Sequence, residues 1–394
     1  MPAESHEQIG SSPRYQMLDV WRGVVSLVVV LEHVGVALWN PENVPALVSF
    51  CHHTVVMVLR WNIGTPLFFV MSGYCIAASL VSSRRRGGNP FGFLGRRLWR
   101  IFPTYWAALL AFAVVVTVLD MMGLARLHDN TLSQRIDSPA NLNLAQWIGN
   151  LTLTETWRPT VGGGEASVFT RVAWSLCYQE QFYLVCVLVL WLAPTRLGRT
   201  LAAVTAAIVL FRIGAWDAGA DHRITGLFPV YWHEFAVGLA VYWRLTGLGA
   251  SSSFASRRAL ELFVAGMLVV GCLHELVSTV AASAFGLLLI ATYRWDHLTA
   301  GLNWLAPVRA LGKRSYSIYL IHLPVVAIGN QLFCDLGLSG YWGRALVMVP
   351  LVTAASVGVG WAFHRLVERK FMTPPQFSRA GSVARGRNYT ALPA

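Results

Sequence analysis

The side chains best placed to do chemistry are ionisable residues inside apolar stretches. Arg22 and His33 are eleven residues apart in the first such stretch. At about 100° and 1.5 Å per residue they share one helix face, roughly 16 Å apart along the axis. Asp19 lies one turn before Arg22 and could pair with it. His33 is a candidate general base for a hydroxyl; the alternative is a packing histidine hydrogen-bonded to a neighbouring helix.

Two later stretches also contain polar side chains at helical spacing. Ser315, Tyr319 and His322 form a second polar stripe, and Pro324 follows it, which predicts a kink just beyond His322. Another stretch contains three consecutive polar residues that cannot all face lipid, so Glu180 is expected to face a cavity.

The strongest basic cluster is predicted in a loop at 83–100. One interpretation is an anchor on the positive side of a membrane, with anionic lipid contacts. Arg97 and Arg100 indicate something more specific, because residues three apart on a helix share a face. Two guanidinium groups so placed could clamp a phosphate of a cosubstrate.

The amino-acid composition indicates what kind of structural element holds these residues. Apolar residues make up 55% of the 394 residues and charged residues 13%, against roughly 25% charged in soluble domains. This predicts an all-α polytopic membrane protein and excludes both a soluble fold and a disordered chain. The net charge of +12 must first be tested against the positive-inside rule before nucleic acid is considered.

About ten stretches are long and apolar enough to span a bilayer. They cover 18–39, 62–82, 101–121, 174–193, 200–219, 225–244, 259–276, 278–294, 315–335 and 344–364. With both termini inside, 23 of the 31 basic residues fall on the inner side, seven on the outer side and Arg212 within a span. This bias predicts cytoplasmic termini and accounts for most of the positive charge without nucleic acid.

The remaining segments divide the chain simply. Residues 1–16 are a polar cytoplasmic segment before a retained helix, 17–366 are the membrane domain, and 367–394 are a basic tail expected to be disordered. The outer loop 122–173 is either a plain connection or a lid over an acceptor site. The segment 44–60 is expected to be re-entrant or interfacial. The six cysteines lack metal-ligand spacing, so no metal is predicted.

Five motifs in order, from about residue 15 to 365, resemble the acyltransferase-3 family of integral membrane O-acyltransferases. The segments are Leu18-Asp19-Val20-Trp21-Arg22-Gly23 with Leu31-Glu32-His33, Pro66-Leu67-Phe68-Phe69-Val70-Met71-Ser72-Gly73-Tyr74, Arg96-Arg97-Leu98-Trp99-Arg100-Ile101-Phe102-Pro103, Trp174-Ser175-Leu176-Cys177-Tyr178-Gln179-Glu180-Gln181-Phe182-Tyr183 and Ser315-Tyr316-Ser317-Ile318-Tyr319-Leu320-Ile321-His322-Leu323-Pro324. Two positions depart from the family pattern. Gln179 replaces a glutamate, so a carboxylate role falls to Glu180, and Val20 replaces a glycine.

The resemblance implies an acyl-CoA donor, most simply acetyl-CoA, approached from the cytoplasm, and a protein located in the inner membrane of a bacterium. It implies a hydroxyl acceptor on a sugar, glycolipid or macrolide. The implied catalytic residues are His33, Arg22, Glu180 and His322. The implied CoA-binding residues are Arg96, Arg97 and Arg100, and the implied substrate-cavity residues are Glu32, Ser72 and Tyr319. Oligomeric state, acyl length and a covalent acyl-histidine step are left open.

Two other classes of protein fit the same composition. A transporter or flippase of a lipid-linked sugar or metabolite would also contain helices interrupted by prolines such as Pro66 and Pro324. The two halves of the chain show no matching repeat, which favours the enzyme. A non-catalytic lipid-binding protein would leave the shared face of Arg22 and His33 without a purpose.

Overall fold

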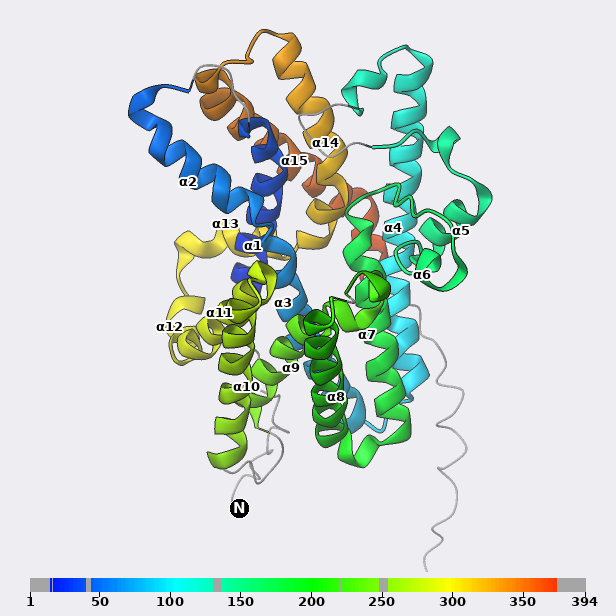
Figure 1. Ribbon diagram of the computed structural model, residues 1–394, viewed down its shortest axis with the longest axis vertical. Coiled ribbons are helices and arrows are strands. Elements are labelled where there is room, and N and C mark those ends of the chain that lie inside the picture. Colours follow the sequence, from blue (N-terminus) through cyan, green and yellow to red (C-terminus); the bar gives the residue numbers. More distant parts are fainter. Residues whose placement is uncertain are drawn as a thin grey trace, which may run out of the picture.

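The protein is a bundle of helices. The computed structural model describes residue 15 and residues 17–39, 44–129, 136–219, 221–247 and 254–373, and every regular element in these ranges is a helix (Figure 1). Eight of the described helical segments are long and apolar enough to cross a membrane. The prediction of an all-α polytopic membrane protein is therefore confirmed.

The predicted count of ten spans is not confirmed by length and composition. The eight segments that qualify contain α1 (Leu18–Val34), α3 (Gly64–Arg85), α4 (Pro90–Met121), α7 (Ala173–Leu192), α8 (Leu197–Asp217), α11 (Val277–Thr292), α14 (Ser315–Asp335) and α15 (Val349–Phe363). Two further predicted spans correspond to α9 (Trp232–Thr246) and α10 (Phe254–Leu273). Helix α9 has only 15 residues, and α10 contains Arg257, Arg258 and Glu261 in its first turns.

Short helices connect and flank the long ones. They are α2 (Ser49–Arg60), α5 (Leu144–Thr152), α6 (Arg158–Gly162), α12 (Asp296–Ala300), α13 (Ala306–Gly312) and α16 (Arg369–Phe371). The segment predicted as re-entrant or interfacial is thus α2, a 12-residue helix on which Phe50 and Met57 are exposed. Both termini of the described chain approach one cavity, because Asp19 and Met372 line it together.

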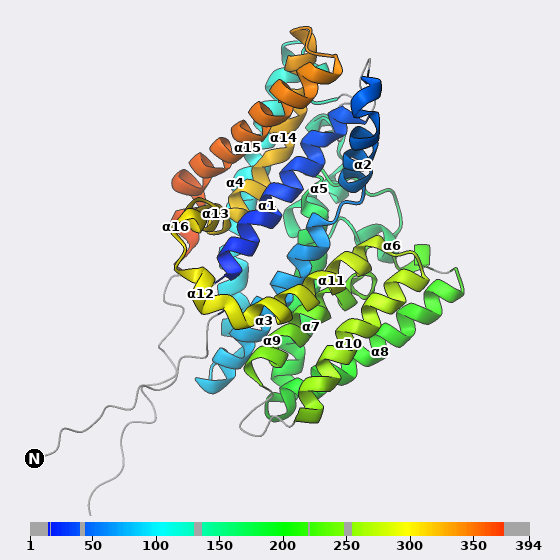
Figure 2. The same cartoon turned by 90° about the vertical axis from the view of Figure 1, so that its left-hand side faces the viewer.

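The helices pack in two sets. Helices α1, α14 and α15 run side by side, and α13 packs on α1 (Figure 2). Helix α3 packs on α9, and α10 and α11 also pack on α9. Helix α3 touches α1 as well, so it joins the two sets.

Glycines allow the closest of these contacts. A Cβ added to Gly73 on α3 would overlap the carbonyl oxygen of Phe235 on α9, and a Cβ on Gly238 would overlap the carbonyl oxygen of Val70. The two helix backbones therefore touch through a pair of glycines, as small residues permit in membrane helices. This contact fixes the position of α3, whose residues Ser72 and Cys75 line the cavity.

The predicted loop at 83–100 is wrong in extent. Helix α3 continues to Arg85, and α4 begins at Pro90, so only four residues separate them. Asn89 ends the turn because its side chain accepts a hydrogen bond from the Phe91 N–H at 2.9 Å, and Pro90 occupies the first helical position. Arg97 and Arg100 therefore lie on a helix, as their spacing requires.

One other helical segment differs in extent from the prediction. The last helical segment continues through the π-helical turn His364–Glu368 to Phe371, beyond the predicted start of the tail at 367. Residues 374–394 of that tail, and most of 1–16, lie outside the described residues. Helix α14 has the predicted bounds, Ser315 to Asp335, with Pro324 inside it.

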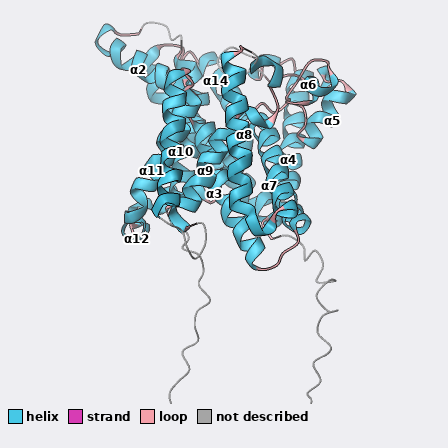
Figure 3. Cartoon of the chain, turned by 60° about the horizontal axis from the view of Figure 1, so that its bottom comes forward, coloured by secondary structure: helices cyan, strands magenta, loops and turns pink. Residues whose placement is uncertain are grey.

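The outer loop is folded against the helices rather than extended. Helices α5 and α6 lie beside α4 (Figure 3), and the Tyr105 hydroxyl of α4 donates to the Asn150 carbonyl at 2.8 Å. The Glu155 side chain is fully buried and accepts two hydrogen bonds from Arg158, each 2.9 Å. These hydrogen bonds raise the pKa of Arg158. The carboxylate and guanidinium thus hold this segment together.

Candidate active site

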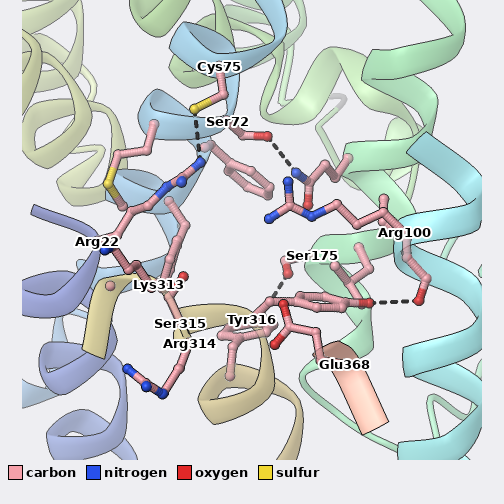
Figure 4. A pocket seen from close by; sticks show the side chains of 18 of the residues that line it. Arg22, Ser72, Cys75, Arg100, Ser175, Lys313, Arg314, Ser315, Tyr316 and Glu368 are labelled. Atoms are coloured by element: carbon pink, nitrogen blue, oxygen red, sulfur yellow. Dashed lines mark hydrogen bonds between the residues drawn. The ribbon is translucent and has the colours of Figure 1, made fainter. Parts of the chain in front are cut away.

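A cavity of about 560 Å³ lies where α1, α3, α4, α7, α14 and the last helical segment converge. We define the basic end of the molecule as the end where α1 and α4 begin, α3 ends, and Arg84, Arg85 and Arg86 lie. Asp19 and Arg22 line the cavity from the start of α1, so the cavity is nearer the basic end than His33, which is in the last turn of α1. The polar and charged lining residues are Asp19, Arg22, Thr65, Ser72, Cys75, Arg97, Arg100, Ser175, Gln179, Tyr183, Lys313, Arg314, Ser315, Tyr316, Tyr319, His364 and Glu368 (Figure 4).

Positive charge exceeds negative charge on this lining. Its cations are Arg22, Arg97, Arg100, Lys313 and Arg314, and its carboxylates are Asp19 and Glu368. Within the described part of the chain, Arg22 alone of the five cations makes an ion pair, with Asp19 at 3.6 Å. The Glu368 carboxylate is used by neighbours, because it accepts hydrogen bonds from Ser317 and from His364 Nδ1. Four cations are therefore available to meet an anionic ligand.

Two of the cations are held against α3. Arg22 donates to Cys75 Sγ at 2.9 Å, as Figure 4 shows. Arg97 donates to the Ser79 hydroxyl and to the Cys75 carbonyl, and its guanidinium lies 5.8 Å from the centroids of both the Phe93 and Tyr183 rings. These contacts fix the direction of both guanidinium groups before any ligand arrives.

The three arginines of the predicted CoA clamp lie in different places. Arg100 is exposed and lines the cavity, Arg97 lines it from a half-buried position, and Arg96 is exposed and lies outside the lining. The clamp predicted from spacing thus has two members at the cavity. Lys313 and Arg314, which precede α14, join them from the opposite wall.

The inner wall of the cavity is formed by hydroxyl and amide groups. The Gln179 amide donates to Ser72 Oγ and to the Tyr183 hydroxyl, each at 2.5 Å. The Tyr319 hydroxyl donates to the Val172 carbonyl at 2.9 Å and lies 2.7 Å from Ser175 Oγ. Ser72 and Tyr319, which we predicted as residues of a substrate cavity, both line this one.

The two predicted catalytic histidines lie next to each other, behind the side chains that line the cavity. The His33 and His322 rings are 5.0 Å apart between centroids. The Tyr319 ring lines the cavity and is 5.9 Å from the His322 ring. Phe68 packs edge-on against Tyr319 at 5.6 Å, so an aromatic layer separates the cavity from the histidine pair.

Hydrogen bonding settles the tautomer of His322. Its Nδ1 is 2.8 Å from the Tyr319 carbonyl oxygen, which can only accept, so Nδ1 has the proton. Its Nε2 is therefore a lone-pair acceptor, and this atom is buried without a hydrogen-bond partner in the described structure. An unpaired buried acceptor beside a second imidazole is costly, which marks the pair as a functional candidate.

Glu32 points away from the cavity. Its carboxylate accepts hydrogen bonds from the Gly64 N–H at 3.0 Å and 3.3 Å, and it is 4% exposed. Gly64 is the first residue of α3, so Glu32 caps that helix. The position of Glu32 next to His33 in the sequence did not predict that it caps α3. Consecutive residues on a helix point about 100° apart, and this offset indicated that Glu32 and His33 face different neighbours.

Glu180 is also outside the cavity lining. Its Oε1 is buried without a hydrogen-bond partner in the described structure, and none of the described histidines donates to it. It lies within electrostatic range of the Tyr105 and Tyr316 hydroxyls instead. The structure thus brings His33 and His322 together but not Glu180 with either.

Sequence reasoning missed two cations, one histidine and one carboxylate of the lining: Lys313, Arg314, His364 and Glu368. Lys313 and Arg314 directly precede the motif that begins at Ser315, so the sequence could have predicted that they lie at the start of that helix. The last two lie in a stretch predicted as the end of a span and a tail, and only the π-helical turn places them in the cavity. Among the described residues, no cluster of three metal-ligating side chains occurs.

The fold and the cavity define a polytopic membrane protein with a cation-lined cavity at one end. The chain belongs to the acyltransferase-3 family, because residues 15–365 match the family's acyltransferase domain. It is therefore a membrane enzyme that transfers acyl groups. No solved protein structure matches it.

Three relatives support the family assignment at low identity. The chain is 26% identical over 340 residues to BcsY of Komagataeibacter xylinus, named as a membrane-bound transacylase, with 84% of this chain and 81% of BcsY covered. It is 24% identical over 345 residues to the acyltransferase MdmB of Streptomyces mycarofaciens, covering 79% of this chain and 81% of MdmB. YrhL of Bacillus subtilis, named as a peptidoglycan O-acetyltransferase, is 26% identical over 336 residues; the match covers 76% of this chain and 49% of YrhL.

Proposed function

We propose that the enzyme transfers an acyl group from acyl-CoA to a hydroxyl group of a carbohydrate or macrolide, with His33 as general base. The excess of unpaired cations in the cavity supports the donor, because CoA contains several phosphate charges. Arg100, Lys313 and Arg314 would contact these phosphates at the basic end, and Arg22 and Arg97 lie deeper. The names of YrhL and MdmB support an oxygen acceptor on a glycan or a macrolide.

The histidine pair supports the base assignment. The His322 Nε2 lone pair can accept the N–H of His33, which leaves the second ring nitrogen of His33 free to take a proton. This arrangement would orient His33 as a carboxylate orients the histidine of a catalytic triad. His322 acts in this proposal as a positioning residue, and Tyr319 fixes its tautomer.

In the proposed reaction the thioester end of the donor passes the aromatic layer of Phe68 and Tyr319 and meets the acceptor at His33. The acceptor hydroxyl attacks the thioester carbonyl carbon while His33 removes the hydroxyl proton. The C–O bond forms, the C–S bond breaks, and the proton passes from His33 to the leaving CoA sulfur. The products are the O-acyl ester and free CoA thiol, so the step needs no further reactant.

Orientation in the membrane supports donor entry from the cytoplasm. The basic end contains many of the arginines, and the positive-inside rule predicts that such an end faces the cytoplasm. The donor cavity lies at that end, and the histidine pair lies further toward the opposite end. The proposed location is the bacterial inner membrane, with the acceptor reaching His33 from the outer side.

Replacing His33 with alanine tests the proposal directly. We expect transfer to fall by about 10²–10⁴-fold, the usual contribution of a general base. The measurement is acceptor acylation and thiol release from acetyl-CoA in membranes at matched expression. His53→Ala is the control, because His53 is an exposed histidine on α2. Unchanged turnover in His33→Ala would refute the base, and absence of thiol release by the wild type would favour a transporter.

A further inference from the structure

A second cavity lies on the other side of the molecule. It has a volume of about 750 Å³ and shares no lining residue with the first. Helix α9 contributes its floor through Ala236, Leu239 and Ala240, which are 2–3% exposed. Helices α8 and α10 both pack on α9 and stand apart from one another in Figure 1, and they contribute its walls. We call this cavity the α8–α10 groove.

The mouth of the groove is cationic. Arg84, Arg196 and Arg199 line it, and all three are exposed at the basic end. In the described part of the chain none of them makes an ion pair. Nearby arginines differ in this respect, since Arg244 and Arg258 both pair with Glu261, at 2.6 Å and 2.8 Å. The groove thus presents three uncompensated guanidinium groups.

A helix N-terminus lies at the same mouth. Helix α8 begins at Leu197, its first-turn residues Gly198 and Arg199 line the groove, and no side chain caps it. The first N–H groups of a helix have no partner within the helix, and they favour a bound phosphate. The arginines and the helix terminus therefore select the same kind of group.

The interior of the groove is mostly apolar. Its walls are mostly small or aliphatic side chains: Leu201, Ala202, Ala206, Ala236, Leu239, Ala240, Ala259 and Leu260. From Arg196 to Ala206 the helix rises about 15 Å, at roughly 1.5 Å per residue. That length is about half of a hydrocarbon core of roughly 30 Å, so the mouth and the slot together extend over the depth of about one leaflet.

We propose that the α8–α10 groove binds one anionic phospholipid from the leaflet at the basic end. The phosphate lies against Arg84, Arg196, Arg199 and the α8 N-terminus, and one acyl chain occupies the slot. A soluble phosphate compound would use the mouth but not the apolar slot, and a zwitterionic lipid would leave the excess charge uncompensated. This site is separate from the acyl-transfer cavity and does not depend on the proposed reaction.

Native mass spectrometry of the full-length protein in detergent tests the site. The probes are phosphatidylglycerol, phosphatidylcholine with the same acyl chains, and inorganic phosphate. We expect one tight phosphatidylglycerol site, with phosphatidylcholine at least about tenfold weaker. Equal affinity for the two lipids would overturn the proposal. So would displacement of the lipid by millimolar phosphate, which would indicate a site for soluble anions.

Matched variants separate the mouth from the slot. We expect Arg196→Gln with Arg199→Gln to weaken phosphatidylglycerol binding by about 100-fold, since removing each charge-assisted hydrogen bond weakens binding roughly tenfold. Arg85→Gln is the control, because Arg85 is exposed outside the groove. Ala202→Phe should block the acyl chain, whereas Ala203→Phe, on the same exposed helix surface but outside the lining, should not. The site is refuted if the arginine variant binds phosphatidylglycerol as tightly as Arg85→Gln, or if Ala202→Phe binds it as tightly as Ala203→Phe. Thermal unfolding must show that each variant is folded.

Discussion

Single residues in the cavity divide between those already engaged and those free to meet a ligand. Arg22 and Arg97 are held by Cys75, Ser79 and nearby aromatic rings. Arg100 has no ion-pair partner in the described structure and lies exposed at the lining. A ligand phosphate would therefore find Arg97 positioned in advance and Arg100 free to close on it.

This difference predicts how the two arginines respond to mutation. Arg100→Gln should raise the KM for acetyl-CoA by about 10-fold or more, because it removes a charge-assisted hydrogen bond to phosphate, and should leave thermal stability unchanged. Arg97→Gln should raise the KM and also lower the unfolding temperature, since Arg97 holds α4 to α3. Arg86→Gln is the control, because Arg86 lies outside the cavity. An unchanged KM in both cavity variants would remove the phosphate role.

At the scale of helices, the site depends on how closely α3 approaches α9. Gly73 and Gly238 bring the two backbones into contact, and α3 then presents Ser72 and Cys75 to the cavity. Glu32 contributes from α1 by capping the first turn of α3. Helix α3 is thus held at its first residue and at its middle, which leaves its lining face fixed.

Adding one methyl group at Gly73 should disturb this arrangement. Gly73→Ala would force α3 away from the Phe235 carbonyl, and we expect a loss of about 1–3 kcal/mol together with reduced transfer. The measurement is thermal unfolding in detergent beside the transfer assay. Gly266→Ala on α10 is the control, because a Cβ there meets nothing within 4 Å. Equal stability of the two variants would contradict the close contact.

The sequence predicted helices well and their contacts less well. The spacing of Arg22 and His33 correctly gave a shared face, because helix geometry is local. The partner of His33 came from a distant helix, α14, so only tertiary packing could reveal it. Glu32 was predicted to line the substrate cavity because it adjoins His33, yet its direction on the helix takes it to Gly64. Likewise, hydropathy could not place His364 and Glu368 in the cavity, since their turn looked like a tail.

Across the whole molecule, charge is sorted between the two ends. The donor cavity and the mouth of the α8–α10 groove both lie at the basic end, and both contain cations without ion-pair partners among the described residues. Helix α2 and the folded outer segment lie toward the opposite end. The positive-inside rule then assigns the basic end to the cytoplasm.

Cysteine labelling checks this orientation. Cys51 on α2 and Cys272 near the end of α10 are both exposed. In a Cys272→Ser background a membrane-impermeant maleimide should label Cys51 in intact cells, and adding Cys51→Ser should remove that signal. A cysteine introduced by Arg86→Cys in a background of Cys51→Ser and Cys272→Ser should react only after the membrane is broken. The reverse pattern would place the donor cavity on the outer side and contradict entry of acyl-CoA from the cytoplasm.

The aromatic layer of Phe68 and Tyr319 affects how fast water hydrolyses the bound donor. Water that fills the cavity beside a bound thioester is kept from the histidine pair, so hydrolysis of the donor should stay slow until an acceptor arrives. Tyr319→Ala should therefore increase thiol release without ester product. Tyr319→Phe keeps the ring and should retain most of the protection while losing the bonds to Ser175 and Val172. If the two variants waste acyl-CoA equally, the ring is not the barrier.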